Sequence, residues 1–237
     1  MVRVILFLAA LICCLLANPV LAKENGVIQS GNPARQVVAL TFDDGPKPEF
    51  SQRILNILDL YGIKATFFVV GKEAKEQPDE VYRMYDSGQE IGNHTYSHAS
   101  LMGLGEKEIK KEIEDLDDVI YEITGQRPKY FRPPGGAYDG RILGIAKDQG
   151  MALVLWDLNS SDYDSESEEF EIDKDYDALA KELADRVTKK AKNGSIILLH
   201  NGSSQTVKAL PAIIEGLRAR GFAFVTISEL LNPGENW

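Results

Sequence analysis

Short apolar runs that alternate with longer amphipathic stretches limit the folds open to this chain more than any other feature. The runs are almost continuously apolar, which is typical of parallel strands whose two faces are both covered. We predict strands at Val37–Phe42, Ala65–Val70, Ile91–Gly92, Tyr130–Phe131, Ala152–Trp156, Ser195–Leu199 and Ala223–Ile227. About seven strands separated by helices predict an α/β fold with a parallel sheet.

Helical periodicity fills several of the intervals between these runs. Apolar residues recur every three or four positions over residues 54–61, 109–123, 179–191 and 210–217, and a glycine follows each stretch within a few residues. Pro211 then falls in the first turn of the last predicted helix, where proline is tolerated. The sheet could be open and doubly wound or curled into a barrel. Because no glycine-rich phosphate loop follows the first strand, we favour the barrel.

The first 22 residues differ from the rest of the chain. Arg3 is their only charged residue, an apolar run extends over Val4–Ala17, and Val20 and Ala22 fit the −3 and −1 positions of a cleavage site. We predict a secretory signal peptide at 1–22, a flexible leader at 23–36 and a folded domain at 37–232. An uncleaved membrane anchor is the alternative, although the run is short for a spanning helix. Both interpretations predict export, and cleavage predicts no stable membrane association.

Cysteine content and charge narrow the chemistry. The two cysteines, Cys13 and Cys14, lie inside the predicted signal, so metal ligands in the domain must be histidine, aspartate or glutamate. The formal net charge of −10 argues against nucleic acid as a partner, because phosphate binding requires clusters of lysine and arginine. A neutral polymer is a more compatible substrate than a polyanion.

The residues able to carry chemistry follow the predicted strands. They are His94, His98, His200, Asp43, Asp44, Arg132, Asp157 and Asp162. In parallel α/β folds the active site lies at the carboxyl edge of the sheet. We therefore expect these side chains to meet at that edge.

Two of these segments suggest a metal site. His94 and His98 stand four residues apart and, with a carboxylate from another strand, can fill three positions of a divalent metal. Zinc is the first expectation, and cobalt, nickel or manganese are also compatible. The adjacent Asp43 and Asp44 could divide into a ligand and a general base. The alternatives are a surface histidine pair and an acidic turn that caps the next helix.

Three further segments allow two interpretations each. In RPPGG, residues 132–136, Arg132 either orients a carboxylate or is solvated in a stiff turn. In SIILLHNG, residues 195–202, His200 is either catalytic or a satisfied structural histidine. The acidic segment at 162–177 is either a solvated surface loop, which we favour, or a rim of the substrate cleft.

Taken in order, TFDDGP, HTYSH, RPPGG, SDY at 161–163 and LLH at 198–200 resemble the motifs of the polysaccharide deacetylases, carbohydrate esterase family 4. The resemblance covers residues 37–232 and rests on a specific, ordered set of motifs. It implies a distorted (β/α) barrel of the NodB type, and metal-dependent removal of acetyl groups from N-acetylated sugars.

The resemblance also implies roles for individual residues. Asp44, His94 and His98 correspond to metal ligands. Asp43 corresponds to the general base that acts on water, and Arg132 holds Asp43 ionised and oriented. These assignments are expectations from the matching motifs.

The remaining assignments concern the substrate. His200 corresponds to the general acid that protonates the leaving amine, and Asp162 supports it. Leu198 would line the pocket for the acetyl methyl group. Gly135 stands where the family often has tyrosine, and its main-chain N–H would face the oxyanion. Tyr163 stands where tryptophan is common.

The expected function is therefore that of a secreted or cell-envelope N-deacetylase. Its substrate would be an N-acetylglucosamine-type glycan such as peptidoglycan, chitin oligomers or an exopolysaccharide. One alternative is an O-acetyl esterase acting on xylan. Another is a non-catalytic glycan-binding protein of the same fold, which the presence of Asp43 and His200 argues against.

Overall fold

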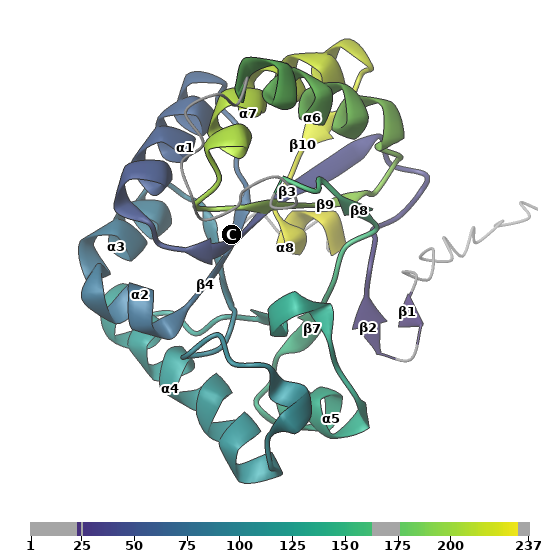
Figure 1. The fold of residues 1–237 in the computed structure, drawn as a ribbon. Coiled ribbons are helices and arrows are strands. Elements are labelled where there is room, and N and C mark those ends of the chain that lie inside the picture. The colour runs from purple at the N-terminus through teal and green to yellow at the C-terminus, as the bar shows by residue number, and fades with distance from the viewer. Residues whose placement is uncertain (1–22, 25, 163–175, 232–237) are drawn as a thin grey trace, which may run out of the picture.

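A computed structural model describes residues 23–24, 26–162 and 176–231 of the chain. These residues form one curled sheet with helices packed around its outside (Figure 1). The predicted signal at 1–22 and most of the acidic segment lie outside the described residues. The described part therefore holds the strands whose carboxyl ends were expected to carry the site.

The sheet is parallel apart from one edge. Its strands are β1 (Lys23–Glu24), β2 (Val27–Ile28), β3 (Val37–Gly45), β4 (Thr66–Val69), β5 (Glu90–Asn93), β6 (Tyr130–Phe131), β7 (Ala152–Val154), β8 (Leu158–Asn159), β9 (Ile196–His200) and β10 (Ala223–Phe224). The order is β1-β2-β7-β6-β5-β4-β3-β9-β8, with β10 paired to β3, and β1 and β2 are the antiparallel pair among the described strands. The predicted distorted parallel barrel is confirmed.

Alternation along the central strand β3 explains how the barrel is filled. Val38, Leu40 and Phe42 point outward, into the core shared with the helices. The alternate residues point into the barrel: Val37, Ala39, Thr41 and, last, Asp43. The residue type therefore changes from apolar to ionisable along the inward face, toward the carboxyl end of the strand.

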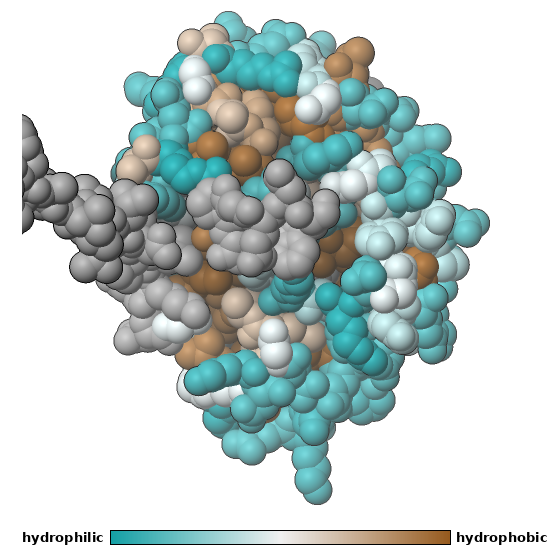
Figure 2. Space-filling view, turned by 180° about the vertical axis from the view of Figure 1, so that it is seen from behind, coloured by the Kyte–Doolittle hydropathy of each residue, from teal (hydrophilic) through white to brown (hydrophobic). Residues whose placement is uncertain are grey.

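Helices cover the outer face of the sheet (Figure 1). They are α1 (Pro48–Leu60), α2 (Gly71–Glu76), α3 (Pro78–Asp86), α4 (Glu106–Thr124), α5 (Gly140–Asp148), α6 (Tyr176–Lys190) and α7 (Ser204–Ala219), whereas α8 (Ile227–Leu231) packs against residues inside the curl of the sheet. α4 buries Ile109, Ile113, Leu116 and Ile120, the stripe expected from its sequence, and ends before Gly125 in the left-handed conformation. Polar side chains cover much of the periphery seen from behind, with smaller hydrophobic areas between them (Figure 2).

The short helix α8 packs at the amino ends of the strands. Glu90, the first residue of β5, accepts hydrogen bonds from the main-chain N–H and hydroxyl of Ser228 and from the hydroxyl of Thr66. Burial raises the pKa of the Glu90 carboxyl, and these hydrogen bonds oppose the shift. This buried network fastens α8 at the edge of the sheet away from the expected site.

The N-terminal edge of the sheet and the start of the last long helix differ from the prediction. Residues 23–36 do not form a leader outside the fold, because Val27 and Ile28 are buried in β2, which pairs with β7. The last long helix begins at Ser204 rather than near Leu210, and Ser203 caps it by accepting the N–H of Thr206. The sheet therefore begins before Val37, the predicted start of the domain.

None of the helices among the described residues is both long and apolar enough to cross a membrane.

Candidate active site

The carboxyl ends of β3, β5 and β9 bring the predicted catalytic residues together. Asp43 lies opposite His200 in the register of β3 and β9, and His94 follows the last residue of β5. Arg132 directly follows β6 and is fully buried. The edge expected from the sequence is therefore the edge where these side chains meet.

A β-bulge explains how two consecutive aspartates serve one site. Asp43 pairs with Phe68 and Gly45 with Val69, so Asp44 is an extra residue in β3. Asp44 has a φ of 70°, a left-handed conformation that is uncommon outside glycine. A bulge re-aims the side chain of the extra residue. The Asp44 carboxylate thereby reaches His94 and His98, while Asp43 keeps its inward direction.

Asp44, His94 and His98 form a group that can hold a metal ion. Oδ1 of Asp44 lies 3.4 Å from Nε2 of His94 and 3.1 Å from Nε2 of His98, and one donor atom from each residue lies within 4.8 Å of the others. Nitrogen and oxygen ligands about 2.0–2.1 Å from a tetrahedral zinc ion stand about 3.3 Å apart. The separations to Asp44 thus fit a first-row divalent metal.

The orientation of His94 supports the same fit. Its Nδ1 lies 2.7 Å from the main-chain oxygen of Arg132, which can only accept, so Nδ1 carries the proton. In the neutral ring, Nε2 is then left with a lone pair that faces the Asp44 carboxylate. Two electron-rich atoms at this separation suit a cation between them, and a fixed tautomer of this kind is common for metal-binding histidines.

The charges in this group shift the pKa values of Asp44 and His98. Burial favours a higher pKa for the Asp44 carboxyl, but hydrogen bonds and charges from protonated His94 and His98, in the absence of a metal, outweigh burial and hold the pKa far below its ordinary value. The hydrogen bond to Asp44 is the main cause of a raised pKa at His98. Asp44 is therefore ionised over the whole range in which the protein would work.

Arg132 holds Asp43 in one orientation. Its Nη1 donates to Oδ1 of Asp43 at 2.6 Å and to the hydroxyl of Thr41 at 2.9 Å. Nε donates to the carbonyl oxygen of Val154 and Nη2 to that of Leu155. Burial lowers the pKa of Arg132, while the charge of Asp43 opposes this shift. Arg132 thus donates to four acceptors, so Oδ1 of Asp43 is fixed, and Oδ2 lies 3.7 Å from Nε2 of His94.

His200 and Asp162 form a second charged pair. Nδ1 of His200 lies 2.7 Å from Oδ1 of Asp162, and the main-chain N–H of His200 donates to Oδ2. Burial favours a lower pKa for His200, but the hydrogen bond and charge of Asp162 outweigh it and the pKa is raised. Asp162 has a lowered pKa because its hydrogen bonds and the charge of His200 outweigh burial.

The sequence did not reveal the residues that hold Asp162. The hydroxyl of Ser160 donates to Oδ1, the hydroxyl of Thr206 to Oδ2, and Ser203 to the main-chain oxygen. Ser160 stands two residues before Asp162, a spacing that could have been noticed. Thr206 comes from α7, and nothing in the local sequence indicates its contact.

The remaining predicted residues are distributed unevenly. Leu198 is buried on β9, two residues before His200, and so shares its face of the strand. Gly135 has a φ of 64° and open space where a side chain would begin.

Asp157 lies away from the site. Its carboxylate accepts hydrogen bonds from the hydroxyl of Ser195 and the main-chain N–H of Ile196, at the start of β9. Tyr163 lies outside the described residues.

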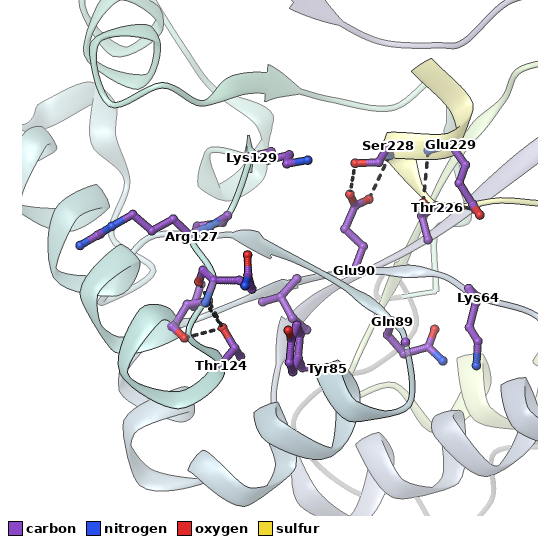
Figure 3. A pocket seen from close by; sticks show the side chains of 15 residues that line it. Lys64, Tyr85, Gln89, Glu90, Thr124, Arg127, Lys129, Thr226, Ser228 and Glu229 are labelled. Carbon is purple, nitrogen blue, oxygen red and sulfur yellow. Dashed lines mark hydrogen bonds between the residues drawn. The ribbon is translucent and has the colours of Figure 1, made fainter. Parts of the chain in front are cut away.

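A pocket of about 770 Å³ lies at the opposite edge of the sheet, at the amino ends of β4, β5 and β6 (Figure 3). It is lined by Lys64, Tyr85, Gln89, Glu90, Arg127, Lys129 and Ser228, among others. None of the Asp, His or Arg residues of the expected site lines it. The ionisable side chains expected to act in catalysis lie at the carboxyl ends of the strands, so we place the candidate active site at the carboxyl edge and not in this pocket.

Comparison with known proteins gives concordant matches. Residues 30–154 match the family model described as polysaccharide deacetylase. The chain is 35% identical over 199 residues to a peptidoglycan-N-acetylglucosamine deacetylase of Bacillus cereus, covering 83% of this chain and 88% of that protein. It is 37% identical to the peptidoglycan-N-acetylmuramic acid deacetylase PdaC of Bacillus subtilis, covering 84% of this chain but only 39% of the length of PdaC.

One of the solved structures with the same fold is described as a pseudoenzyme. A wild-type pseudoenzyme of family CE4 from Bacillus anthracis aligns with a TM-score of 0.78 and 30% identity, over 87% of this chain and 69% of that one. Similarity of fold thus extends to proteins described as inactive. The activity of a given chain must therefore be argued from its own residues.

Proposed function

The chain belongs to the polysaccharide deacetylase family, and on that premise we propose that it is a metal-dependent hydrolase that removes N-acetyl groups from a glycan. The observation that carries the proposal is the convergence of three metal-binding side chains, Asp44, His94 and His98, beside the buried Asp43–Arg132 pair. We propose an N-acetylglucosamine-type polymer such as peptidoglycan as the substrate, supported by the activities named for the relatives.

Asp44, His94 and His98 would hold the metal, for which zinc is the first choice and cobalt, nickel or manganese are alternatives. When bound, such an ion acts as a Lewis acid that polarises a carbonyl group and makes water more acidic. Three protein ligands leave coordination positions open for substrate and solvent. The donor set itself, one carboxylate and two imidazoles, is the support for this assignment.

Asp43 is the proposed general base. Its Oδ1 is occupied by Arg132, so Oδ2 is the oxygen that takes a proton from the attacking water. The same oxygen lies 3.7 Å from Nε2 of His94, next to the metal-binding group. The 2.6 Å ion pair with Nη1 of Arg132 holds the Asp43 carboxylate in one orientation for this role.

His200 is the proposed general acid. An amide nitrogen leaves only after protonation, and the Nδ1 contact with Asp162 orients the ring so that Nε2 is the nitrogen that donates. We assign the acetyl methyl to the space beside Leu198. The main-chain N–H of Gly135 would donate to the developing oxyanion, and Tyr163 would contact the sugar.

We also propose that the protein is exported and acts outside the cell or in its envelope. The apolar segment at 1–22, with its small-residue cleavage site, supports this location, as do the peptidoglycan substrates named for the relatives. The deacetylase domain would then extend to about residue 232, beginning before Val27 because β2 belongs to the sheet.

One experiment separates an N-deacetylase from an O-acetyl esterase. The wild type should release acetate from N-acetylglucosamine oligomers and peptidoglycan, and His200→Ala should lower this rate by about 10²–10⁴-fold. An alkoxide leaves with less help than an amine, so the effect on an acetyl ester should stay within about tenfold. The measurement is released acetate from matched amide and ester substrates.

Two results would contradict the proposal. Equal losses on amide and ester substrates would remove the assignment of His200 to the leaving amine. Saccharide binding without acetate release from any substrate would instead favour a non-catalytic glycan-binding protein, as in the pseudoenzyme of the same fold.

The pH profile should depend on Asp162. His200 must be protonated to donate, and Asp162 is the nearest of three carboxylates that raise its pKa above the ordinary value of 6.5, with Asp43 and Asp44. Activity should therefore be present below the His200 pKa and fall as the pH rises through it. Asp162→Asn removes the carboxylate that raises the His200 pKa most, so the alkaline limb should move to lower pH.

The control for this profile is Asp118→Asn, which removes an exposed carboxylate that pairs with Arg127 on the surface. Its pH profile should match that of the wild type. An alkaline limb that stays in place in Asp162→Asn would show that His200 is not the group that titrates there.

A further inference from the structure

The segment that carries both metal-binding histidines has a strained backbone. Within the segment 94–98, Thr95 has a φ of 69° and His98 a φ of 58°, both in the left-handed region. Asn93 supports the first turn by accepting the N–H of Thr95 at 2.9 Å. Conformations of this kind persist where the surroundings fix them. The contacts of this segment therefore decide where the two imidazoles lie.

Helix α4 supplies one set of these contacts. The main-chain oxygen of Glu112 accepts the N–H of Tyr96 at 2.9 Å, and that of Ile113 accepts the side-chain amide of Asn93 at 2.9 Å. The Glu112 carboxylate adds two bonds: Oε2 accepts the N–H of Ser97 at 2.8 Å, and Oε1 accepts its hydroxyl at 2.6 Å. One glutamate thus holds two consecutive residues of the segment.

Helix α2 holds the other side of the segment through its main chain. The N–H groups of Gly71 and Lys72 donate to the carbonyl oxygens of Thr95 and Tyr96. A Cβ at Gly71 would lie 2.7 Å from the Cα of Tyr96, so glycine permits this close approach. Because these are main-chain contacts, they survive side-chain substitution in the segment.

The two histidines differ in how they are held. The His94 ring is 2% exposed, and its Nδ1 is bound to the Arg132 carbonyl oxygen. The His98 ring is 43% exposed and contacts Asp44. With less packing around the ring, the position of His98 depends more on the backbone that carries it. Ser97, which Glu112 binds, is the residue immediately before His98.

We propose that Glu112 is a positioning residue that fixes His98 for metal binding by holding Ser97. The proposal rests on the proposed metal-dependent function. Glu112 acts through the main chain rather than by contact with metal or substrate. Groups that orient a metal ligand typically change metal affinity by about 10–100-fold when removed. A residue that only joins α4 to the segment would change the stability of the fold and leave zinc affinity unchanged.

The test measures the zinc dissociation constant of the metal-free protein by competition with a fluorescent chelator. Glu112→Ala should weaken zinc binding by about 10–100-fold relative to the wild type. Glu112→Gln keeps one strong acceptor in place of two, so its dissociation constant should lie between these values. The matched control is Glu114→Ala on the same helix, which removes an exposed partner of Lys110 and should bind zinc as the wild type does.

A double-mutant cycle tests whether Glu112 changes zinc affinity through its contact with Ser97. Ser97→Ala removes the hydroxyl bond and keeps the N–H bond, so its effect should be smaller than that of Glu112→Ala. The two substitutions should be less than additive when combined, because they remove a shared contact. Additive effects would mean that Glu112 does not act through Ser97.

The outcomes separate this inference from the proposed function. If the wild type binds no zinc, the proposed function fails at its metal site. If the wild type binds zinc and Glu112→Ala binds it equally well, with or without a lower melting temperature, the positioning role is overturned. Should Glu112→Ala not fold, Glu112→Gln decides, and an unchanged dissociation constant there would overturn the role.

Discussion

Replacing Asp43 by asparagine should lower the rate of acetate release by about 10²–10⁴-fold, the usual contribution of a general base. Asparagine has nearly the same shape, and its carbonyl oxygen can still accept from Nη1 of Arg132. It cannot take a proton from water. The loss should therefore appear in kcat, measured as acetate released from N-acetylglucosamine oligomers at saturating substrate.

The neighbouring aspartate provides a matched comparison. Asp44→Asn should weaken zinc binding, because it removes the carboxylate that lies between His94 and His98. Asparagine tolerates the left-handed backbone at this position, so the fold should be retained. Asp43→Asn should keep zinc affinity close to that of the wild type. If both variants lost zinc equally, or if Asp43→Asn kept its activity, the division of roles between the two aspartates would be wrong.

Removal of the metal should have an effect of similar size. Without the ion, Asp44, His94 and His98 offer electron-rich atoms to a space with no Lewis acid, and the remaining residues must act on an unpolarised amide. A catalytic metal contributes several kcal/mol of transition-state stabilisation, so activity should fall by on the order of 10³-fold. Asp43 and His200 remain in place, and adding zinc or cobalt to the chelated protein should restore activity.

The sequence predicted most of the fold because its signals are local. Near-continuous apolar runs mark strands that helices cover, and β6 agrees with its predicted residues. β2 was missed because a two-residue strand, Val27–Ile28, is too short to show a period. The start of α7 was misplaced because Pro211 was expected in a first turn, whereas the helix continues through it from Ser204.

The candidate site could be predicted as a set of residue types but not as a geometry. Aspartate and histidine at strand ends indicate metal and acid–base chemistry, and their carboxyl-edge position follows from parallel strands. The bulge that turns Asp44 toward the histidines depends on the pairing of β3 with β4, which the sequence of one strand does not contain. The support from Thr41, Thr206 and Glu112 depends on contacts between segments far apart in the chain.

These positioning residues share a physical reason for escaping sequence analysis. A threonine on an inward strand face or a glutamate on an amphipathic helix is an ordinary residue in its local context. Glu112 lies on α4 among many charged residues, and only the fold shows that its carboxylate faces Ser97. Such residues are found by following the hydrogen bonds of each candidate ligand outward from the site.

The most direct test of metal-dependent N-deacetylation is acetate release from N-acetylglucosamine oligomers by chelated, dialysed protein titrated with zinc. We predict near-background release at the start and a rise with added zinc that levels off at about one ion per chain, as expected for the single Asp44–His94–His98 group found among the described residues. Asp43→Asn should stay near background throughout the titration. Full acetate release by the metal-free protein, or no release at any zinc concentration, would contradict the central claim.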